Sequence, residues 1–221
     1  MERLGVIIVA GGNGVRMGAE LPKQFLLLSG EEILVRSLRT FIPYTDNIVV
    51  VLPEAEIDRW RKIVANRSLE HTHTVFTGGA TRFHSVKNGL KALGDCDVVA
   101  IHDAVRPLVS RRVIDDALSV EAEFGSAVPV VEQVDSFRVV TPEGVRPIDR
   151  STLRAVQTPQ IFRREILDEA YRARYMKSFT DDATVVEHAG YEVAYSVGDR
   201  CNLKITSPDD LLLAEAFLST K

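Results

Sequence analysis

The densest group of residues that could do chemistry follows the first apolar run of the chain. It reads Ala10-Gly11-Gly12-Asn13-Gly14-Val15-Arg16-Met17-Gly18 and is followed by Pro22-Lys23-Gln24. Glycines after a parallel strand let backbone N–H groups approach a phosphate, because no Cβ stands in the way. Arg16 and Lys23 add two cations seven residues apart, which suit the charge of a triphosphate. A plain strand-to-helix turn with two surface cations explains the same spacing.

Two familiar phosphate-binding motifs do not fit this loop. A P-loop closes with Gly-Lys followed by Ser or Thr, and the loop has no such ending. The dinucleotide-binding fingerprint requires a third small residue at the position that Met17 occupies. The sequence therefore supports neither a P-loop nucleotidase nor a dinucleotide-dependent oxidoreductase.

A second group, Ile101-His102-Asp103-Ala104-Val105-Arg106-Pro107, ends another apolar run. Ligands of open α/β sheets bind beyond the carboxyl ends of the strands, so we expect this group to lie near the first loop. Asp103 could hold Mg²⁺, which takes one or two protein carboxylates together with phosphates and water. Arg106 could bind a phosphate through its guanidinium fork. A lone aspartate at the end of a strand also commonly caps a helix.

Three further segments carry weaker signals. The Gly78-Gly79 pair opens a predicted helix whose free N–H groups can bind a base edge or an anion. Thr158 lies in Gln157-Thr158-Pro159-Gln160, and Lys204 is expected on a short strand near the end of the chain. A lysine in an apolar strand needs an anionic partner or a route to solvent, which favours a site.

The remaining candidates for chemistry give no pattern. The chain has five histidines without metal-ligand spacing, and we expect His71 and His73, in a polar stretch, to face the solvent. The nucleophile motif Gly-x-Ser-x-Gly of serine hydrolases does not occur in the sequence. These observations favour neither a metalloenzyme built on histidines nor a serine hydrolase.

The elements that must position these residues alternate along the chain. Apolar runs predict strands at Val6–Ala10, Asn47–Leu52, His73–Phe76, Asp97–His102 and Ser126–Val130. Helix-length segments lie at Ile33–Phe41, Glu54–Ala65, Thr81–Leu93 and Arg111–Glu123, and Ser207-Pro208 begins a last helix that runs to about Leu218. Most of the runs are apolar throughout, as in strands covered on both faces. We predict one α/β domain over residues 1–221, with a Rossmann-like, mostly parallel twisted sheet and helices on both faces.

One stretch, at about residues 131–156, interrupts this alternation. Gln133–Val140 and Gly144–Ile148 read as a β-hairpin whose turn is Thr141-Pro142-Glu143-Gly144. A hairpin lying on its own sheet is the simpler interpretation. The sharper one is an arm that reaches a second subunit.

Composition limits the possible partners. The chain has 221 residues, 45% of them hydrophobic, and a net charge of −4, so it is globular and has no overall field for nucleic acid or anionic membrane. Cys96 and Cys201 lie far apart and outside any metal-binding spacing, which favours reduced thiols in the cytoplasm. No apolar run reaches the ~18–20 residues that cross a bilayer.

Taken together, the motifs resemble those of the 2-C-methyl-D-erythritol 4-phosphate cytidylyltransferase family of the non-mevalonate isoprenoid pathway. The resemblance covers nearly the whole chain, and its order makes it more specific than any single motif. Six segments carry it: Ala10-Gly11-Gly12-x-Gly14-x-Arg16-Met17, Pro22-Lys23-Gln24, Gly78-Gly79-x-x-Arg82-x-x-Ser85-Val86, His102-Asp103-x-x-Arg106-Pro107, Gln157-Thr158-Pro159-Gln160 and Asn202-x-Lys204-Ile205-Thr206.

The resemblance implies transfer of CMP from CTP to the phosphate of methylerythritol 4-phosphate, with release of pyrophosphate, in a homodimer that uses Mg²⁺. The catalytic residues that it implies are Arg16, Lys23 and Lys204. The residues implied for CTP are Ala10, Gly11, Gly12, Gly14, Gly79, Ser85 and Asp103, of which Asp103 also lies by the metal. The residues implied for the acceptor are Arg106, Thr158 and, from the arm of the partner subunit, Ser136 and Arg150.

The sequence departs from the family's pattern in two places. The family usually has Asp-Thr in the arm where this chain has Asp135-Ser136, and an acidic residue where this chain has Ala80. The first departure leaves room for a second acceptor, ribitol 5-phosphate, on the same nucleotide site. A nucleotide sensor without catalysis is the alternative from another class. Retention of four charged residues together argues against it: Arg16, Lys23, Asp103 and Lys204.

Overall fold

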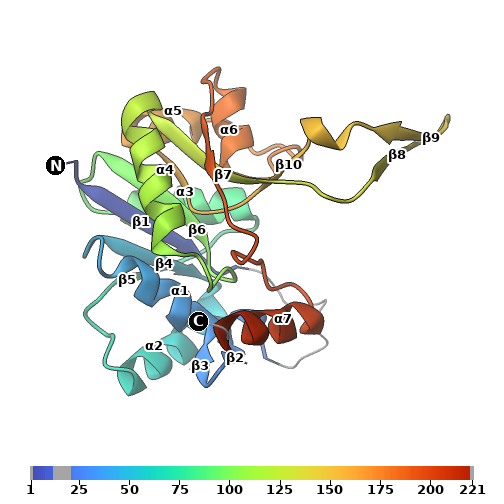
Figure 1. The fold of residues 1–221 in the computed structure, drawn as a ribbon. Helices are drawn as coiled ribbons and strands as arrows, with labels where there is room; N and C mark the ends of the chain where they lie inside the picture. Colours follow the sequence, from blue (N-terminus) through green and yellow to red (C-terminus); the bar gives the residue numbers. More distant parts are fainter. Residues whose placement is uncertain (1, 12–20, 220–221) are drawn as a thin grey trace.

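A twisted β-sheet forms the centre of the protein, in a computed structural model that describes residues 2–11 and 21–219 (Figure 1). The predicted parallel strands are present as β1 (Leu4–Val9), β4 (Ile48–Leu52), β5 (Thr74–Thr77) and β6 (Val98–Asp103). β1 lies between β6 and β4, and β5 follows β4, all in parallel register. Because Val9 is paired with Asp103, the residues that follow β1 and the end of β6 lie at the same edge of the sheet.

The other half of the sheet contains strands that the sequence analysis did not predict. β11 (Gln160–Arg163) runs antiparallel between β6 and β7 (Ser126–Glu132). β10 (Arg154–Val156) pairs antiparallel with β7, and β12 (Tyr195–Val197) pairs parallel with it. The sheet is mostly parallel, as expected, with two antiparallel strands, β10 and the insertion β11 next to β6. This insertion brings the segment around Thr158 against the end of β6.

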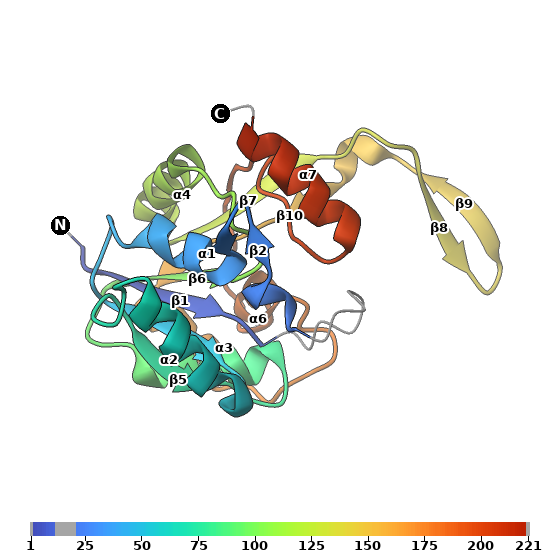
Figure 2. The same cartoon turned by 90° about the horizontal axis from the view of Figure 1, so that it is seen from below.

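Helices cover both faces of the sheet (Figures 1 and 2). One face packs against α1 (Ile33–Phe41), α2 (Ile57–Asn66) and α4 (Arg111–Phe124), and the other against α3 (Arg82–Ala92), α5 (Arg164–Ala170) and α6 (Asp182–His188). Successive strand residues alternate between the two cores: Val6 and Ile8 enter one, Ile7 and Val9 the other. None of the helices in the described part of the chain has the length and apolar character needed to cross a membrane.

A smaller layer covers the carboxyl edge of the sheet. The short strands β2 (Leu27–Leu28) and β3 (Glu31–Glu32) pack with α7 (Pro208–Ser219) around Val105 and Ile205. The predicted start of α7 is confirmed, because the Asp210 N–H donates to the Ser207 hydroxyl. The Asp210 carboxylate in turn accepts the N–H groups of Thr206 and Ser207.

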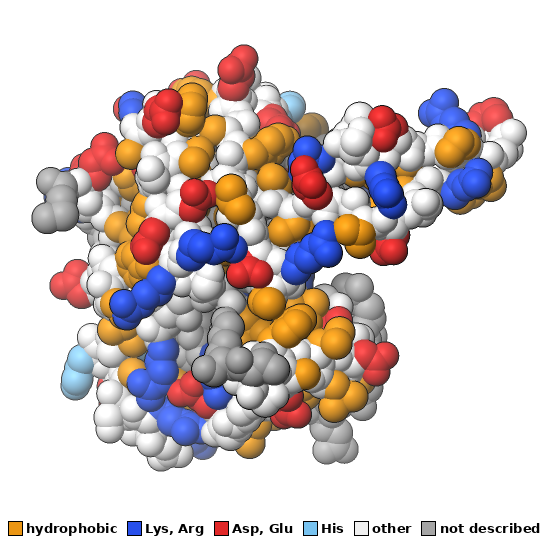
Figure 3. All heavy atoms as spheres, viewed as in Figure 1, with side chains coloured by type: hydrophobic (Ala, Val, Ile, Leu, Met, Phe, Trp, Pro, Cys, Tyr) orange, Lys and Arg blue, Asp and Glu red, His pale blue; other side chains and the backbone are white. Residues whose placement is uncertain are grey.

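The predicted hairpin projects from the body (Figure 2). β8 (Phe137–Thr141) and β9 (Gly144–Ile148) pair only with each other among the described strands. The simpler interpretation, a hairpin that lies on the central sheet of its own chain, is therefore wrong. Val140 and Val145 are exposed on it, and apolar, basic and acidic side chains are mixed along the projecting surface (Figure 3). The role of this arm in a dimer stays a prediction.

One histidine differs from the expectation. His71 is exposed as predicted, but His73 is partly buried beside Trp60 on α2. The Trp60 indole N–H donates to His73 Nε2 at 2.8 Å, and burial lowers the pKa of His73 to about 4. The polar residues around His73 do not predict this contact, because Trp60 lies 13 residues earlier in the sequence.

Candidate active site

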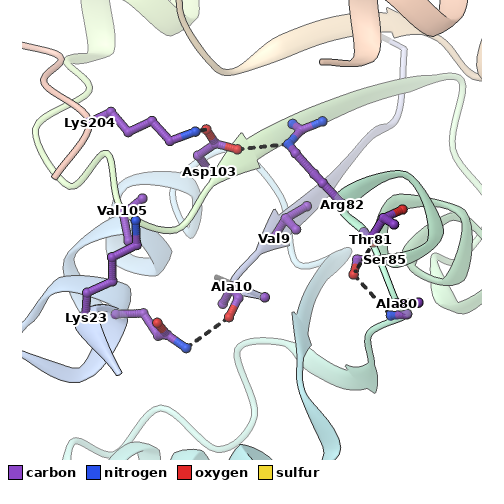
Figure 4. Close-up of a pocket in the computed structure, with 13 residues that line it drawn as sticks. Val9, Ala10, Lys23, Ala80, Thr81, Arg82, Ser85, Asp103, Val105 and Lys204 are labelled. Carbon is purple, nitrogen blue, oxygen red and sulfur yellow. Dashed lines mark hydrogen bonds and ion pairs between the residues drawn. The ribbon is translucent and has the colours of Figure 1, made fainter. Parts of the chain in front are cut away.

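A cavity of about 320 Å³ opens at the carboxyl edge of the sheet, where β1, β5 and β6 end (Figure 4). Its walls come from segments far apart in the chain, as the crevice rule for open α/β sheets predicts. The described residues that line it are Val9, Ala10, Gly11, Lys23, Gln24, Gly79, Ala80, Thr81, Arg82, Ser85, Asp103, Val105 and Lys204. Gly12, Gly14 and Arg16 of the first motif lie outside the described residues.

The Gly78-Gly79 loop forms the wall between β5 and α3. The Ser85 hydroxyl accepts the Gly79 N–H at 3.1 Å and donates to the Thr81 carbonyl at 3.0 Å, so one side chain holds both ends of the loop. A Cβ at Gly79 would overlap His84 in the first turn of α3. Thr81 caps α3 by accepting the His84 N–H. The loop therefore requires glycine at position 79 and keeps a fixed shape beside the cavity.

Lys23 reaches the cavity from a short 3₁₀ helix, Lys23–Phe25. Gln24, which is buried, donates from Nε2 to the Ala10 carbonyl at 3.0 Å, and Phe25 packs in the core near Trp60. These two anchors tie the helix to the end of β1. Lys23 is thus presented to the cavity by the residues that follow it in the sequence (Figure 4).

Asp103, at the end of β6, is the centre of the charged side of the cavity. Lys204 Nζ lies 2.7 Å from Asp103 Oδ2, and Arg82 Nε donates to Oδ1 at 3.2 Å. Burial by itself would raise the pKa of Asp103, but the charges of Arg82 and Lys204 hold it well below its usual range. Asp103 is therefore an ionised carboxylate with a cation on each oxygen, and it does not cap a helix.

Lys204 has the anionic partner that the sequence predicts, but it is not on a strand. It lies in an irregular segment between β12 and α7. The segment is held by the Ile205 N–H, which donates to the Val105 carbonyl at 2.8 Å, and by the buried side chain of Ile205. The apolar neighbours of Lys204 therefore pack below it against the edge of the sheet, without pairing as a strand.

Arg82 and Asp182 are site residues to which the sequence analysis assigned no role. The Arg82 guanidinium donates from both terminal nitrogens to the carboxylate of Asp182 on α6, at 2.9 and 2.7 Å. Asp182 is fully buried and also accepts the Tyr171 hydroxyl at 2.6 Å. In the sequence, Arg82 stands in one of the six segments that resemble the family. Asp182 lies 100 residues further along the chain, outside all six segments, so no sequence motif pointed to it.

Thr158 supports Asp103 from the antiparallel insertion. Its hydroxyl accepts the Asp103 N–H at 3.0 Å and lies 3.1 Å from His102 Nδ1. Since the hydroxyl donates to Nδ1, the His102 proton is on Nε2, which lies 3.1 Å from the Arg106 carbonyl. Burial lowers the pKa of His102 to about 4. His102 is therefore a neutral, fully bonded residue that shapes the Asp103 loop.

A second cavity, of about 220 Å³, adjoins the first. Arg106 and Thr158 line it, and Arg82, Asp103 and Lys204 line both cavities. Arg106 is nearly buried and donates to the Asn202 carbonyl at 2.7 Å, while its Nε has no hydrogen-bond partner in the described structure. Burial lowers the pKa of Arg106 from its ordinary value.

Ser136 and Arg150 are not part of either cavity in this subunit. Both are exposed at the base of the arm, and Arg150 donates to the Val134 carbonyl. The structure of one chain therefore brings together Lys23, Lys204, Asp103, Gly79 and Ser85 at the first cavity, Arg106 and Thr158 at the second, and leaves the arm residues apart.

The donor set limits what metal the site could hold. Asp103 is the single carboxylate among the described residues that line the first cavity, and the described part of the chain contains no group of three metal-ligating side chains. Such a site does not suit a metal held by protein ligands alone. It does suit Mg²⁺ that takes most of its ligands from phosphates and water.

A cavity lined by cations at the carboxyl edge of an open α/β sheet is the arrangement of nucleotide-binding α/β proteins. Comparison with known proteins narrows this class: residues 4–220 match the family 2-C-methyl-D-erythritol 4-phosphate cytidylyltransferase (IspD). The chain belongs to this family.

Relatives and a solved structure agree over the whole length. The 2-C-methyl-D-erythritol 4-phosphate cytidylyltransferase of Porphyromonas gingivalis is 45% identical over 97% of both chains, and that of Bacteroides fragilis is 42% identical over 96% of this chain and 98% of its own. The crystal structure of the Thermus thermophilus enzyme of that name is 33% identical, with a TM-score of 0.80 over 99% of this chain and 100% of its own.

Proposed function

We propose that this chain transfers CMP from CTP to 2-C-methyl-D-erythritol 4-phosphate and releases pyrophosphate. The observation that carries the proposal is the pair of adjoining cavities that share Arg82, Asp103 and Lys204. Two cavities joined at a cluster of cations suit a reaction between two anionic substrates. Membership of the cytidylyltransferase family supplies their identity.

CTP would occupy the first cavity. The backbone of Ala10, Gly11 and Gly79, with Ser85 fixing the loop, would hold cytosine and ribose, together with Gly12 and Gly14. Lys23 and Arg16 would bind the triphosphate. A small base suits a cavity whose wall at Gly79 is backbone held in a fixed shape by Ser85.

The acceptor phosphate would occupy the second cavity, against Arg106 and the Thr158 segment. Lys204 lines both cavities, so its ammonium lies where the acceptor phosphate must approach the α-phosphate of CTP. The Lys204 ammonium has three N–H donors and its side chain is partly exposed, so it can bind a phosphate while one N–H stays on Asp103. This geometry supports its role as a catalytic residue.

The mechanism needs cations more than a base. A phosphate monoester has a second pKa near ~6, so the attacking oxygen is largely deprotonated at neutral pH. His102, which lies next to Asp103, is buried and bonded on both ring nitrogens, and cannot serve as a base. We infer in-line attack on the α-phosphorus, with Lys23, Arg16 and Lys204 orienting the phosphates and offsetting their charge.

Mg²⁺ would lie beside Asp103. The metal would neutralise charge on the triphosphate, and Asp103 would be its single protein ligand in the described structure. Asp103 is ionised and accessible from both cavities, which supports this assignment.

The arm would complete the acceptor site in a homodimer. Ser136 and Arg150 are exposed at the base of the arm and line neither cavity of their own chain, which supports their contribution from a partner subunit to the sugar phosphate. The two free cysteines and the net charge of −4 support a cytoplasmic enzyme without nucleic acid or membrane partners.

The test of this function is pyrophosphate release with CTP, Mg²⁺ and 2-C-methyl-D-erythritol 4-phosphate. Parallel reactions contain ribitol 5-phosphate or no acceptor. Release with methylerythritol phosphate alone is expected. Release with ribitol phosphate alone would keep the nucleotide site and replace the acceptor, and CTP binding without any release would favour a sensor.

Lys23 offers a test of the mechanism. Lys23→Ala should lower kcat by about 10²–10³-fold, because a preorganised charge at the transition state is lost. The Kd for CTP, measured by calorimetry, should rise much less. Lys62→Ala, an exposed lysine on α2, is the matched control. Equal effects of Lys23→Ala on kcat and on Kd would make Lys23 a binding contact only.

A further inference from the structure

We propose that Asp182 is a positioning residue: it holds the guanidinium fork of Arg82 away from Asp103 and so leaves one Asp103 oxygen for Lys204. The inference rests on the proposed function, since it assigns to Asp182 an effect on the reaction that Lys204 serves. It concerns a residue that lines neither cavity.

The geometry of Arg82 carries the argument. Both of its terminal nitrogens donate to Asp182, one to each oxygen, and only Nε is left for Asp103 Oδ1. With both terminal nitrogens on Asp182, Arg82 bonds Asp103 through Nε and at Oδ1 alone. The second oxygen of Asp103 is thereby free to accept Lys204 at 2.7 Å (Figure 4).

Asp182 can do this because it is itself fixed. It is fully buried at the first turn of α6, and the Tyr171 hydroxyl donates to its Oδ1. The preceding residue, Asp181, caps α6 and accepts from Gln160 of β11 at 2.9 Å. Because Gln160 follows Thr158 closely, the same insertion holds Asp103 from one side and Asp182 from the other.

Loss of the Asp182 charge would change the partners of Arg82. Its fork would then turn to the nearest remaining carboxylate, Asp103, and compete with Lys204 for Oδ2. A charge-assisted bidentate pair of this kind is stronger than a single lysine contact. Lys204 would keep its place in the chain but lose the contact that aims its ammonium between the two cavities.

The experiment is a double-mutant cycle between Asp182→Asn and Lys204→Ala, read as kcat, acceptor KM and calorimetric Kd for CTP. Asp182→Asn alone should lower kcat by about 10²-fold, the order expected for a displaced catalytic group, with Kd for CTP changed by less than about 3-fold. In the Lys204→Ala background, Asp182→Asn should lower kcat further by less than about 3-fold, because the group that it positions is gone.

Glu121→Gln is the matched control. It makes the same change, carboxylate to amide, at a buried residue of α4 outside both cavities, and kcat should stay that of the wild type. The same loss of kcat from Asp182→Asn in both backgrounds would overturn the proposal, since a residue with a structural role alone lowers activity whether or not Lys204 is present.

A second pair of variants tests the same proposal if Asp182→Asn does not fold. Arg82→Gln and Arg82→Gln/Asp182→Asn should have the same kcat within about 3-fold, because Asp182 acts through the fork of Arg82. A clearly lower kcat in the double variant would overturn the proposal. The wild-type protein in the same assay separates the proposed function from the positioning role of Asp182. If the wild type releases no pyrophosphate, the proposed function is wrong and the positioning role is wrong with it.

Discussion

Buried carboxylates occur in two regions of this molecule, and their surroundings are opposite. Asp103 and Asp182, beside the cavities, share the cation Arg82. Asp103 is also paired with Lys204 and, at 4.0 Å, with Arg106, and Asp182 accepts the Tyr171 hydroxyl. Glu121, on α4, is equally buried, but its Oε1 has no hydrogen-bond partner in the described structure.

The pKa values follow the partners and not the depth. Burial, then the charge of Glu2, raises the pKa of Glu121 to about 7, and Arg163 opposes this only in part. The cations around Asp103 overcome the cost of its burial and hold its pKa well below the usual range. The site therefore keeps a negative charge where substrate anions must bind, because the protein supplies more positive charge around it.

The largest effect that tests this difference is the loss of Arg82. Arg82→Ala leaves Asp182 fully buried with one neutral donor, and removing one partner of a buried ion pair costs about 3–5 kcal/mol of the free energy of unfolding. Urea unfolding at pH 7 measures the cost.

Arg61→Ala is the control for that measurement. Arg61 pairs with Asp58 on the surface of α2, where both side chains are mostly exposed, and such pairs contribute at most about 1 kcal/mol. If Arg82→Ala cost no more than Arg61→Ala, Arg82 would not be what compensates Asp182.

Glu121 gives the next largest effect, which is a dependence on pH. Its pKa is about 7 in the folded chain against 4.5 as its ordinary value. Stability from this group is therefore fully present below pH 4.5 and is lost as the pH rises toward 7, because the unfolded chain ionises first. The loss amounts to about 3 kcal/mol.

Comparison of wild type with Glu121→Gln isolates this contribution. The free energy of unfolding of wild type, relative to the variant, should fall between pH 4.5 and pH 7.5, as measured by urea unfolding at several pH values. Other groups cancel in the difference. A difference that does not change with pH would show that Glu121 ionises in the folded chain as easily as in the unfolded chain.

Much of the scaffold and part of the site were predictable from local sequence. The four apolar runs at β1, β4, β6 and β7 predict strands because they are continuous, and Ser207-Pro208 predicts the start of α7 because capping is local. Lys204 was expected to have an anionic partner or a route to solvent, and it has both, since it pairs with Asp103 and its side chain is partly exposed.

The rest depends on contacts between distant segments. The strand expected at Lys204 is wrong, since apolar neighbours can pack under a loop as well as within a sheet. β11 is short, and its antiparallel place between β6 and β7 has no local signal. Asp182 reads as an ordinary helix-start acid, and only its burial against Arg82 gives it a role.

The smallest effect separates the donors that surround Asp182. Tyr171→Phe removes one hydroxyl from the Asp182 carboxylate while the ring keeps its stacking on Phe83 and the Arg82 fork stays in place. A buried hydrogen bond to a charged group contributes about 1.5 kcal/mol, less than the arginine, because a neutral donor offsets less of the buried charge. Tyr191→Phe is the matched control, since its hydroxyl donates to Glu169 at the same 2.6 Å but at an exposed position, and it should cost under about 0.5 kcal/mol. If the two substitutions lowered the free energy of unfolding equally, the distance alone would set the value of the contact, and the burial of Asp182 would not make its partners more important for stability.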